Sequence, residues 1–376
     1  MILEVSDSTI NKRLREQFRV LLEESCNIHL IGMDSLPGDA SGRKYFRMHH
    51  NSGTLIGVWG NDKAENHSFI YFCEHFYSIG LSVPKVYANN ADQGIYLVED
   101  LGYETLADKT SDPSVSQEEA LCLYVQSAKD LAGFQVLGHV GLDYENNCHQ
   151  SPVFDRKNVK EDLQYFIENF FIVANDYLKI SGIEDELEKL TGILTEPQPM
   201  LFLYRDFQCR NMLVRPNGSL GYVDFQAGRR GPLQYDVATL LYASKANISD
   251  EARDVILTEY LDQLEMVLSS QGDLNSLIPI DRRDFISRYY VFVLFRILRA
   301  LGVYLFLAVY EGHWRFLGGV PGALNNLAGV FSKHRDLIEA FPKLNRFIKR
   351  LSSEEVFMSP DKLMRLVDSR QSPKLN

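Results

Sequence analysis

The spacing of apolar residues in the first hundred positions predicts a small mixed domain. Apolar residues recur at helical spacing over residues 7–24, after a cluster of small polar residues that is typical of a helix start. A second helical pattern covers residues 64–78. Five short runs have the composition of strands, at residues 28–36, 44–48, 54–59, 85–88 and 95–99. We therefore expect five short strands with one helix between the third and the fourth.

From residue 116 onward the pattern is almost entirely helical, apart from residues 204–225. There, two short strand-like runs flank a Pro-Asn-Gly sequence, which favours a tight turn. A chain of 376 residues is long enough for two lobes. We therefore expect an α+β protein with a small N-terminal lobe at residues 1–100 and a larger, mainly helical lobe at residues 101–376.

One apolar stretch, residues 289–310, is long enough to cross a membrane. Arg296 and Arg299 stand three positions apart near its middle, share one helical face, and would be costly in a bilayer. We therefore expect a buried helix of the second lobe. Its two arginines then either face a substrate or pair with acidic residues of neighbouring helices.

Charge and cysteine content narrow the possible partners. The chain carries 39 Lys and Arg against 50 Asp and Glu, a net charge of −11, so it lacks the positive field that nucleic acid or an anionic membrane attracts. Its five cysteines show no paired spacing, which indicates neither a disulfide scaffold nor a zinc site. The N-terminus has no signal-peptide pattern. We therefore expect a cytoplasmic protein with no nucleic acid or membrane partner.

The candidate chemistry lies in residues 204–225, YRDFQCRNMLVRPNGSLGYVDF. Five positions separate Asp206 from Asn211, and the hairpin that follows would return Asp224 beside Asn211. Phosphoryl transfer from ATP requires a carboxylate that accepts a hydroxyl proton and oxygen ligands that hold Mg²⁺ against the phosphates. The pattern favours Asp206 as the base and Asn211 with Asp224 as the metal ligands. The alternative is a chance pattern in a polar loop.

A downstream segment supports the first reading. Asp236 follows RRGPLQY at the start of an apolar helix, where its carboxylate can cap the helix and reach back to backbone N–H groups of the catalytic loop. The combined pattern resembles the aminoglycoside phosphotransferase and choline kinase superfamily of protein-kinase-like enzymes. Within it, Gln208, the DFQ at 224–226 and the RGP at 230–232 resemble the anomeric kinases that phosphorylate N-acetylmuramic acid and N-acetylglucosamine in cell-wall recycling.

Two further segments carry the same resemblance. GDASGRKYFR at residues 38–47 is similar to a signature near the N-terminus of these sugar kinases, and RILRALG at 296–302 to one near their C-terminus. The resemblance implies a protein-kinase-like two-lobe α+β fold, whose small N-terminal lobe has a five-stranded antiparallel sheet and one helix. It also implies that ATP and Mg²⁺ are used to phosphorylate the anomeric hydroxyl of an N-acetylated amino sugar.

The resemblance further implies a nucleotide site in the first lobe. Kinase-like folds usually hold the α and β phosphates with a lysine on the third strand, but Val58 stands at that place. We expect Ser41, Arg43 and Lys44 to contact the phosphates instead, with Glu65 orienting one of the cations. The alternative for Arg43 and Lys44 is that they are solvated charges on a hairpin.

The other candidate site residues are chosen by their position relative to the predicted strands and to the catalytic residues. Glu99 and Leu101 end the last strand of the first lobe, where a kinase hinge would bind adenine through its backbone. Arg205 is grouped with the catalytic residues, since it would stabilise the loop by pairing with a nearby acid. Gln208 and Gln226 are candidates for substrate contact, as are the two arginines of the apolar helix.

Three other functions stay open. An aminoglycoside kinase would use the same catalytic residues with a carboxylate-lined pocket, and a choline-type kinase would need an aromatic box. A catalytically weak regulatory module is the third, since the strand-three lysine is missing. For the sugar kinase, the resemblance implies that a nucleotidyltransferase uses the product.

Overall fold

The computed structural model describes residues 7–37, 42–178, 182–244, 246, 248–272 and 278–371. The chain forms two compact units that interleave along the sequence. Unit 1 comprises Met1–Val115, Leu137–Pro152 and Arg210–Arg229, and unit 2 comprises Ser116–Val136, Val153–Cys209 and Arg230–Asn376. The single boundary at residue 100 stays a prediction. The two units do not divide at that residue, because residues 137–152 and 210–229 group with the N-terminal segment in unit 1.

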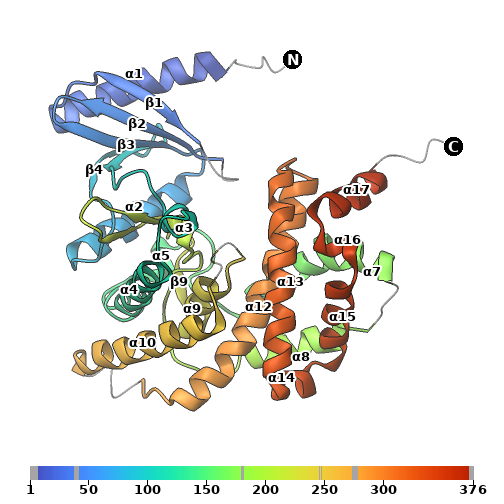
Figure 1. The fold of residues 1–376 in the computed structure, drawn as a ribbon. Coiled ribbons are helices and arrows are strands. Elements are labelled where there is room, and N and C mark those ends of the chain that lie inside the picture. The colour runs from blue at the N-terminus through green and yellow to red at the C-terminus, as the bar shows by residue number, and fades with distance from the viewer. Residues whose placement is uncertain are drawn as a thin grey trace. The chain divides into compact units, whose positions relative to one another are not determined.

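Unit 1 is built on a five-stranded antiparallel sheet in the order β1-β2-β3-β5-β4 (Figure 1). Helix α2 lies between the third and fourth strands in the sequence, as predicted. The elements are α1 (Asp7–Cys26), β1 (Gly32–Leu36), β2 (Lys44–His50), β3 (Gly53–Trp59), α2 (Lys63–Ser78), β4 (Val86–Asn90), β5 (Ile95–Glu99), α3 (Leu106–Ser111), α5 (Tyr144–Asn147), β7 (Met212–Val214) and β8 (Leu220–Tyr222).

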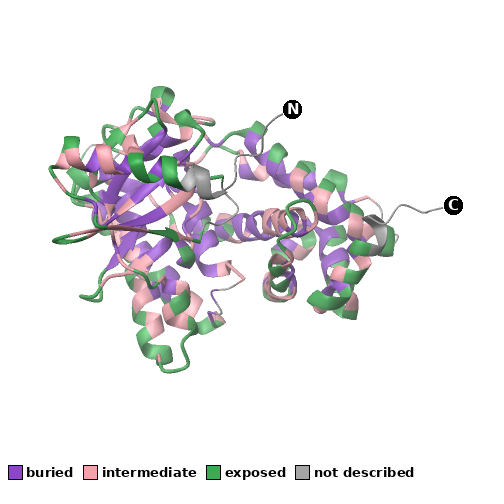
Figure 2. Ribbon diagram, turned by 90° about the horizontal axis from the view of Figure 1, so that it is seen from above, coloured by how far each residue is buried: buried purple, intermediate pink, exposed green. Residues whose placement is uncertain are grey.

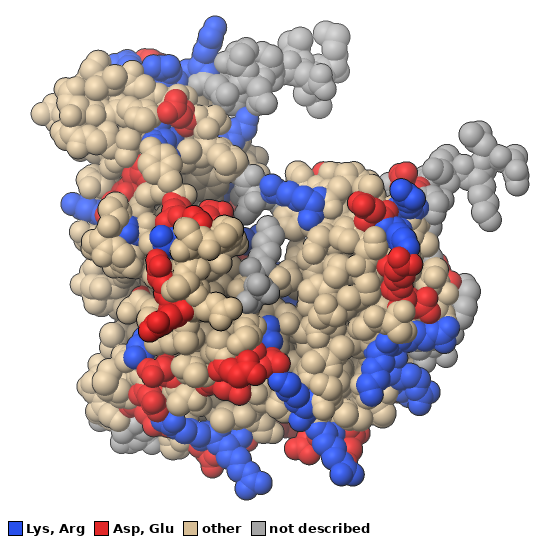
Figure 3. Space-filling model, viewed as in Figure 1, with Lys and Arg blue, Asp and Glu red and all other residues tan. Residues whose placement is uncertain are grey.

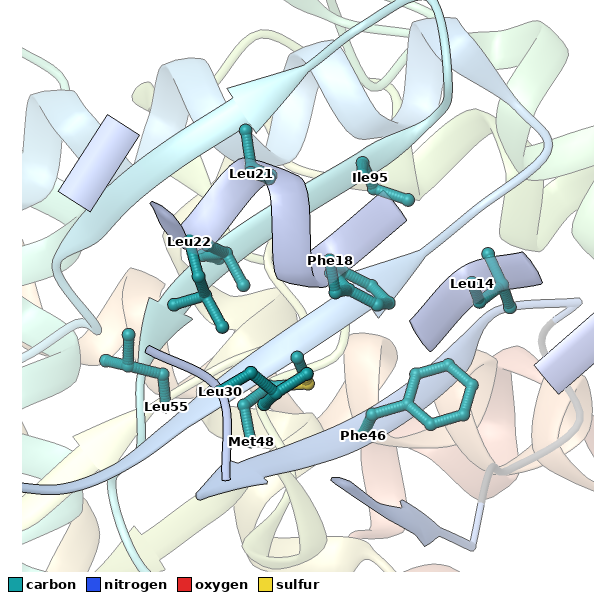
Figure 4. Packing of buried hydrophobic residues seen from close by; sticks show 10 residues of the cluster. Leu14, Phe18, Leu21, Leu22, Leu30, Phe46, Met48, Leu55 and Ile95 are labelled. Carbon is teal, nitrogen blue, oxygen red and sulfur yellow. The ribbon is translucent and has the colours of Figure 1, made fainter. Parts of the chain in front are cut away.

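One face of this sheet packs against α1 (Figure 4). Phe46, Gly57 and Leu97 lie opposite one another on β2, β3 and β5 and so share this face. A Cβ on Gly57 would stand 2.9 Å from the ring of Phe18, so glycine allows the helix to approach the strand closely. The buried side chains of this core are Leu14, Phe18, Leu21, Leu22, Leu30, Phe46, Met48, Leu55, Ile95 and Leu97.

The opposite face carries the alternate residues of the same strands. Tyr45, Val58 and Tyr96 lie opposite one another in a single row. From α2, the ring of Phe69 stacks on Tyr96 with centroids 5.2 Å apart. Val58 is 2% exposed, so the strand-three position that usually carries a lysine is filled by an apolar side chain inside the fold.

The hairpin predicted from the Pro-Asn-Gly turn, β7 and β8, belongs to unit 1. The backbone N–H of Tyr222 donates to the carbonyl oxygen of Ser82 at 2.9 Å, and that of Val214 donates to Glu104 at 2.8 Å. An isolated bridge also joins Thr105 to Leu213. These bonds come from the segments that directly follow α2 and β5, which explains why residues 210–229 group with the sheet.

Unit 2 is mainly helical, as predicted for the second lobe (Figure 1). Its helices are α4 (Gln117–Val136), α6 (Arg156–Phe166), α7 (Ile172–Leu178), α8 (Glu184–Leu194), α9 (Leu233–Tyr242), α10 (Asp250–Ser269), α12 (Arg282–Val309), α13 (Gly319–Lys333), α14 (Arg335–Ala340), α15 (Pro342–Ser353), α16 (Glu355–Met358) and α17 (Pro360–Gln371). A π-helical turn covers Ile167–Phe171 and a 3₁₀ turn Trp314–Gly318. Strands β6 (Met200–Leu203) and β9 (Arg229–Pro232) form a two-stranded sheet, and a 3₁₀ turn, Cys209–Asn211, precedes β7.

Helix α12 is the apolar stretch singled out in the sequence. By length and composition its 28 residues would be able to cross a membrane, and 67% of its most apolar window is buried inside the structure. It packs against α6, α9 and α13 within unit 2. At Gly302 a Cβ would lie 2.9 Å from the Cα of Phe166, so the close approach to α6 depends on glycine. The prediction of a buried helix is confirmed. In Figure 2 buried residues are purple, and they lie on the strands of the sheet and on parts of the helices.

Charged side chains of both signs are interspersed on the face shown in Figure 3. In the described residues, independent of this view, exposed charged side chains form surface ion pairs. Arg282, for example, lies 2.6 Å from both Asp262 and Glu265. Exposed pairs of this kind contribute little to stability, roughly 0–1 kcal/mol each.

Candidate active site

The hairpin of unit 1 brings Asn211 and Asp224 together. The side-chain Nδ2 of Asn211 donates to Oδ2 of Asp224 at 3.0 Å, and the backbone N–H of Val223 donates to the carbonyl oxygen of Asn211 at 3.1 Å. The turn between the strands contains Gly218 with φ of +82°, a conformation that favours glycine. The predicted return of Asp224 to Asn211 is therefore confirmed.

In unit 2, the backbone directly before Asp206 is held by Asp236. The Asp236 carboxylate accepts the N–H of Tyr204 at 2.7 Å and the N–H of Arg205 at 2.8 Å. Arg205 has φ of +76°, a left-handed conformation that is uncommon for a residue with a side chain. The predicted reach of this carboxylate to the catalytic loop is confirmed.

The predicted capping of the following helix by Asp236 is wrong. The N-cap of α9 is Pro232, and Asp236 lies in the first turn with its side chain turned toward the loop. Asp236 is fully buried, and this burial raises its pKa to about 7, against the two N–H donors that favour the ionised form. A carboxylate engaged by two loop N–H groups is not available to its own helix.

Asp162 on α6 joins two arginines of unit 2. Its Oδ1 lies 3.2 Å from Nη2 of Arg205 and 2.8 Å from Nε of Arg299. Burial alone would raise the pKa of Asp162, but the guanidinium groups of Arg299 and Arg205 more than offset it and hold the pKa below its ordinary value. The acid expected to pair with Arg205 is therefore Asp162, and of the two alternatives for Arg299 the structure shows the ion pair.

Arg296 packs against α9 within the same unit. Its Nε donates to Oγ1 of Thr239 and its Nη1 to the hydroxyl of Tyr235, both at 2.7 Å. The guanidinium carbon also lies 4.6 Å from the centroid of the Tyr235 ring. Substrate contact by Arg296 and Arg299 stays a prediction.

Two glutamines lie beside the candidate catalytic carboxylates. Nε2 of Gln208 is 3.4 Å from Oδ1 of Asp206, and Nε2 of Gln226 donates to Oδ1 of Asp224 at 2.8 Å. Each glutamine donates to the carboxylate two positions before it, so each holds the orientation of a candidate functional group. Their contact with substrate stays a prediction.

The described residues that were predicted to bind the nucleotide lie in unit 1. Arg43 is buried and lies 3.0 Å from Glu65, while Lys44 begins β2. Glu99 ends β5 and lies 3.1 Å from Arg215, and Leu101 is buried. Ser41 lies outside the described residues. The alternative that Arg43 is a solvated hairpin charge is wrong, because its side chain is inside the fold.

A family model described as "Phosphotransferase enzyme family" matches residues 34–268. The chain belongs to this phosphotransferase family. The enzyme class predicted from the catalytic pattern is therefore confirmed.

Curated relatives of this phosphotransferase cover most of its length. It is 24% identical over 307 residues to the N-acetylmuramate/N-acetylglucosamine kinase of Pseudomonas aeruginosa, a match that covers 80% of this chain and 84% of that protein. The kinase of the same name from Neisseria meningitidis is 22% identical over 313 residues, covering 81% and 87% of the two chains.

Solved structures show the same fold. The choline kinase LicA from Streptococcus pneumoniae aligns with a TM-score of 0.54 at 16% identity, covering 86% of this chain and 99% of that one. The structure of the gentamicin–APH(2")-IIa complex also aligns with a TM-score of 0.54 at 13% identity, covering 86% of this chain and 97% of that one. The predicted kinase-like two-lobe α+β fold is confirmed.

The residues of the phosphotransferase hairpin fit Mg²⁺ by their chemistry. Asn211 carries an amide oxygen besides the Nδ2 that donates to Asp224, and Asp224 carries two carboxylate oxygens, so both side chains have the oxygen donors that Mg²⁺ prefers. Mg²⁺ typically takes one or two carboxylates together with substrate phosphates and water. Among the described residues no group of three or more His, Cys, Asp or Glu side chains could hold a metal ion alone. One amide and one carboxylate are donors of the kind that Mg²⁺ takes together with phosphates and water.

The sequence did not reveal Asp162 as a member of this network. It lies in α6 within RKNVKEDLQYF, where its neighbours are charged residues typical of a solvated helix surface. Its two arginine partners are 43 and 137 positions away in the chain. No local sequence pattern therefore identifies Asp162 as the buried acid that pairs with Arg205.

Proposed function

We propose that this protein transfers the γ-phosphoryl group of ATP to the anomeric hydroxyl of an N-acetylated amino sugar, of the N-acetylmuramate or N-acetylglucosamine type. The family and the kinases among its relatives support the coarser statement, an ATP-dependent phosphotransferase that acts on a small molecule. The names of the curated relatives support the choice of sugar. The observation that carries the chemistry is the pairing of Asn211 with Asp224 at 3.0 Å.

In the proposed reaction Asp206 is the base. Its carboxylate accepts the proton of the anomeric hydroxyl as the bond from that oxygen to the γ-phosphorus forms. The bond from the γ-phosphorus to the β–γ bridging oxygen breaks, and ADP leaves with the electron pair. Asn211 and Asp224 would hold Mg²⁺, which neutralises charge on the phosphates when it is bound.

The residues around Asp206 then act by positioning. Asp236 and the Asp162–Arg205 pair fix the backbone and side chain directly before the base. Most of the rate enhancement in phosphoryl transfer comes from such positioning and from electrostatic stabilisation. We further propose a cytoplasmic location, where ATP is supplied, and a nucleotidyltransferase that uses the sugar phosphate.

The test is ADP release with Mg·ATP against a panel of acceptors. The panel contains N-acetylmuramic acid, N-acetylglucosamine, other free hexoses, kanamycin and choline. Methyl N-acetylglucosaminide is the matched control, because its anomeric oxygen is blocked while every other hydroxyl remains. An Asp206→Ala variant controls for other ATPases.

We expect turnover on at least one free N-acetylated sugar, none on its methyl glycoside, and loss of turnover in Asp206→Ala. Turnover on the methyl glycoside would show that another hydroxyl is used. Turnover only on kanamycin or choline would replace the sugar by that acceptor. Binding of ATP with no turnover on any acceptor would favour a regulatory module.

A further inference from the structure

The apolar residue at the strand-three position raises the question of which cation faces the nucleotide phosphates. Val58 lies in one row with Tyr45 and Tyr96, on the sheet face opposite α1. A lysine at position 58 would project its amine from this row. Any replacement must bring a positive charge to the same face from a neighbouring segment.

Arg43, in the residues just before β2, brings a charge to that place. Its side chain lies 3.0 Å from Oε1 of Glu65 on α2, and its guanidinium carbon lies 5.9 Å from the ring centroid of Phe69. Burial alone would lower the pKa of Arg43, but Tyr96, Tyr45 and Glu65 offset this and raise the pKa above its ordinary value. Two members of the Val58 row are thus electrostatic neighbours of the guanidinium.

The guanidinium of Arg43 is buried but incompletely bonded. The residue is 5% exposed, and in the part of the chain that the structure describes its Nε and Nη2 form no hydrogen bond. Nη2 is within ion-pair distance of Glu65, but it is not aligned with that carboxylate as a hydrogen bond. Buried N–H groups of a charged side chain are costly without acceptors, so these atoms are suited to an anionic ligand.

Gln226 connects this pair to the candidate metal ligands. Its Nε2 donates to Oδ1 of Asp224 at 2.8 Å and lies 3.4 Å from Oε1 of Glu65. Both partners are carboxylates, which only accept hydrogen bonds when ionised, so the amide must turn its NH₂ toward them. Asp224 also accepts a bond from Asn211. A continuous polar chain therefore runs within unit 1 through Arg43, Glu65, Gln226, Asp224 and Asn211.

We propose that Arg43 is the cation that binds the phosphates of the nucleoside triphosphate, in place of a strand-three lysine, and that Glu65 is the positioning residue that holds it. Gln226 links Glu65 to Asp224, so that the phosphate-binding cation and the metal ligands keep one geometry. This inference rests on the proposed function, because it names how that function's nucleotide is held.

The experiment compares a nucleotide that carries phosphates with one that does not. Calorimetric titration of the full-length protein measures the affinity for Mg·ATP and, separately, for adenosine. The variants are Arg43→Gln, Arg43→Lys and Glu65→Gln. Lys63→Gln is the matched control, since Lys63 is an exposed cation at the start of α2 that lies 3.7 Å from the exposed Asp92.

We expect Arg43→Gln to weaken Mg·ATP binding by roughly 10- to 100-fold, the effect of losing charge-assisted hydrogen bonds, and to leave adenosine binding unchanged. Arg43→Lys keeps the charge and should recover part of the loss. Glu65→Gln should weaken Mg·ATP binding by a smaller factor, again without effect on adenosine. Lys63→Gln should bind both ligands as the parent protein does.

An equal loss of ATP and adenosine affinity in Arg43→Gln would show a structural role for the pair and overturn the inference, as would unchanged ATP affinity. If Arg43→Gln does not fold, as judged by its thermal melt, the same ratio measured in Arg43→Lys and Glu65→Gln decides. Failure of the parent protein itself to bind Mg·ATP would contradict the proposed function instead.

Discussion

The carboxylate of Asp236 accepts the backbone N–H of Arg205 at 2.8 Å, at a residue whose φ is +76°. A left-handed conformation of a residue with a side chain costs roughly 1–3 kcal/mol and persists only when the surroundings enforce it. Here the enforcement comes from a buried acid 31 positions later in the chain. Arg205 directly precedes Asp206 in the chain. The backbone conformation of Arg205 therefore sets the direction in which the side chain of Asp206, the proposed base, projects from the loop.

Replacement of this acid should change how stability depends on pH. The folded-state pKa of Asp236 is about 7, above the unfolded value of about 3.9, so the folded protein binds the proton more tightly. This group's contribution to stability is therefore fully present below pH ~4 and is lost as pH rises to ~7, by roughly 4 kcal/mol. In Asp236→Asn the decline should be absent, while one loop N–H loses its acceptor at every pH.

The measurement is urea unfolding of the parent and Asp236→Asn proteins between pH 4.5 and 7.5. Asp92→Asn, which alters a fully exposed acid, is the control and should follow the parent curve. Equal slopes for the parent and Asp236→Asn would contradict the assignment.

Asp162 should be needed for the stability of unit 2. Asp162→Asn removes the negative charge that Arg205 and Arg299 share and leaves a buried guanidinium without its counter-ion. We expect the free energy of unfolding to fall by about 3 kcal/mol. Asp185→Asn is the matched control, because Asp185 is 91% exposed and lies 3.7 Å from Lys343, a pair of small expected effect. Similar unfolding midpoints for the two variants would refute this role.

The proposed metal role of Asp224 predicts an altered Mg²⁺ requirement. Asp224→Asn keeps the size of the side chain and removes its charge. We expect the Mg²⁺ concentration for half-maximal ADP release to rise by about 10- to 100-fold, the range seen even for residues that only support a metal ligand. Asp34→Asn, on the exposed edge strand β1, should leave it unchanged. An unaltered Mg²⁺ curve in Asp224→Asn would remove this residue from the metal site.

The contact between Gly57 and Phe18 predicts a large effect of a single methyl group. Gly57→Ala places a Cβ 2.9 Å from the Phe18 ring, and we expect a loss of about 1–3 kcal/mol in the free energy of unfolding. Gly192→Ala, in helix α8, meets no atom within 4 Å and should be neutral or stabilising by up to about 1 kcal/mol. Thermal or urea unfolding of the two variants checks both values. A neutral Gly57→Ala would mean that α1 shifts freely on the sheet.

Much of unit 1 was predictable from the sequence because its signals are local. Alternating and helical spacings located the five strands and α2, and the Pro-Asn-Gly turn located the hairpin that returns Asp224 to Asn211. The order of motifs along the chain was enough to indicate the phosphotransferase family. Periodicity, turn chemistry and motif spacing are properties of neighbouring residues, so they can be read without the fold.

The tertiary structure alone decided which distant groups meet. Asp236 was expected to cap its own helix, but the fold turns it toward the loop that precedes Asp206. The sequence around Asp162 is typical of a solvated helix and gives no sign of burial. Only the fold places Arg205 and Arg299 beside this carboxylate. From the sequence, Arg43 was either a phosphate contact or a solvated charge on a hairpin. Its burial beside Glu65 excludes the solvated charge. In each case the role of a charged side chain depends on partners that are far away in the sequence. A local sequence pattern does not encode which of these residues meet or how deeply they are buried.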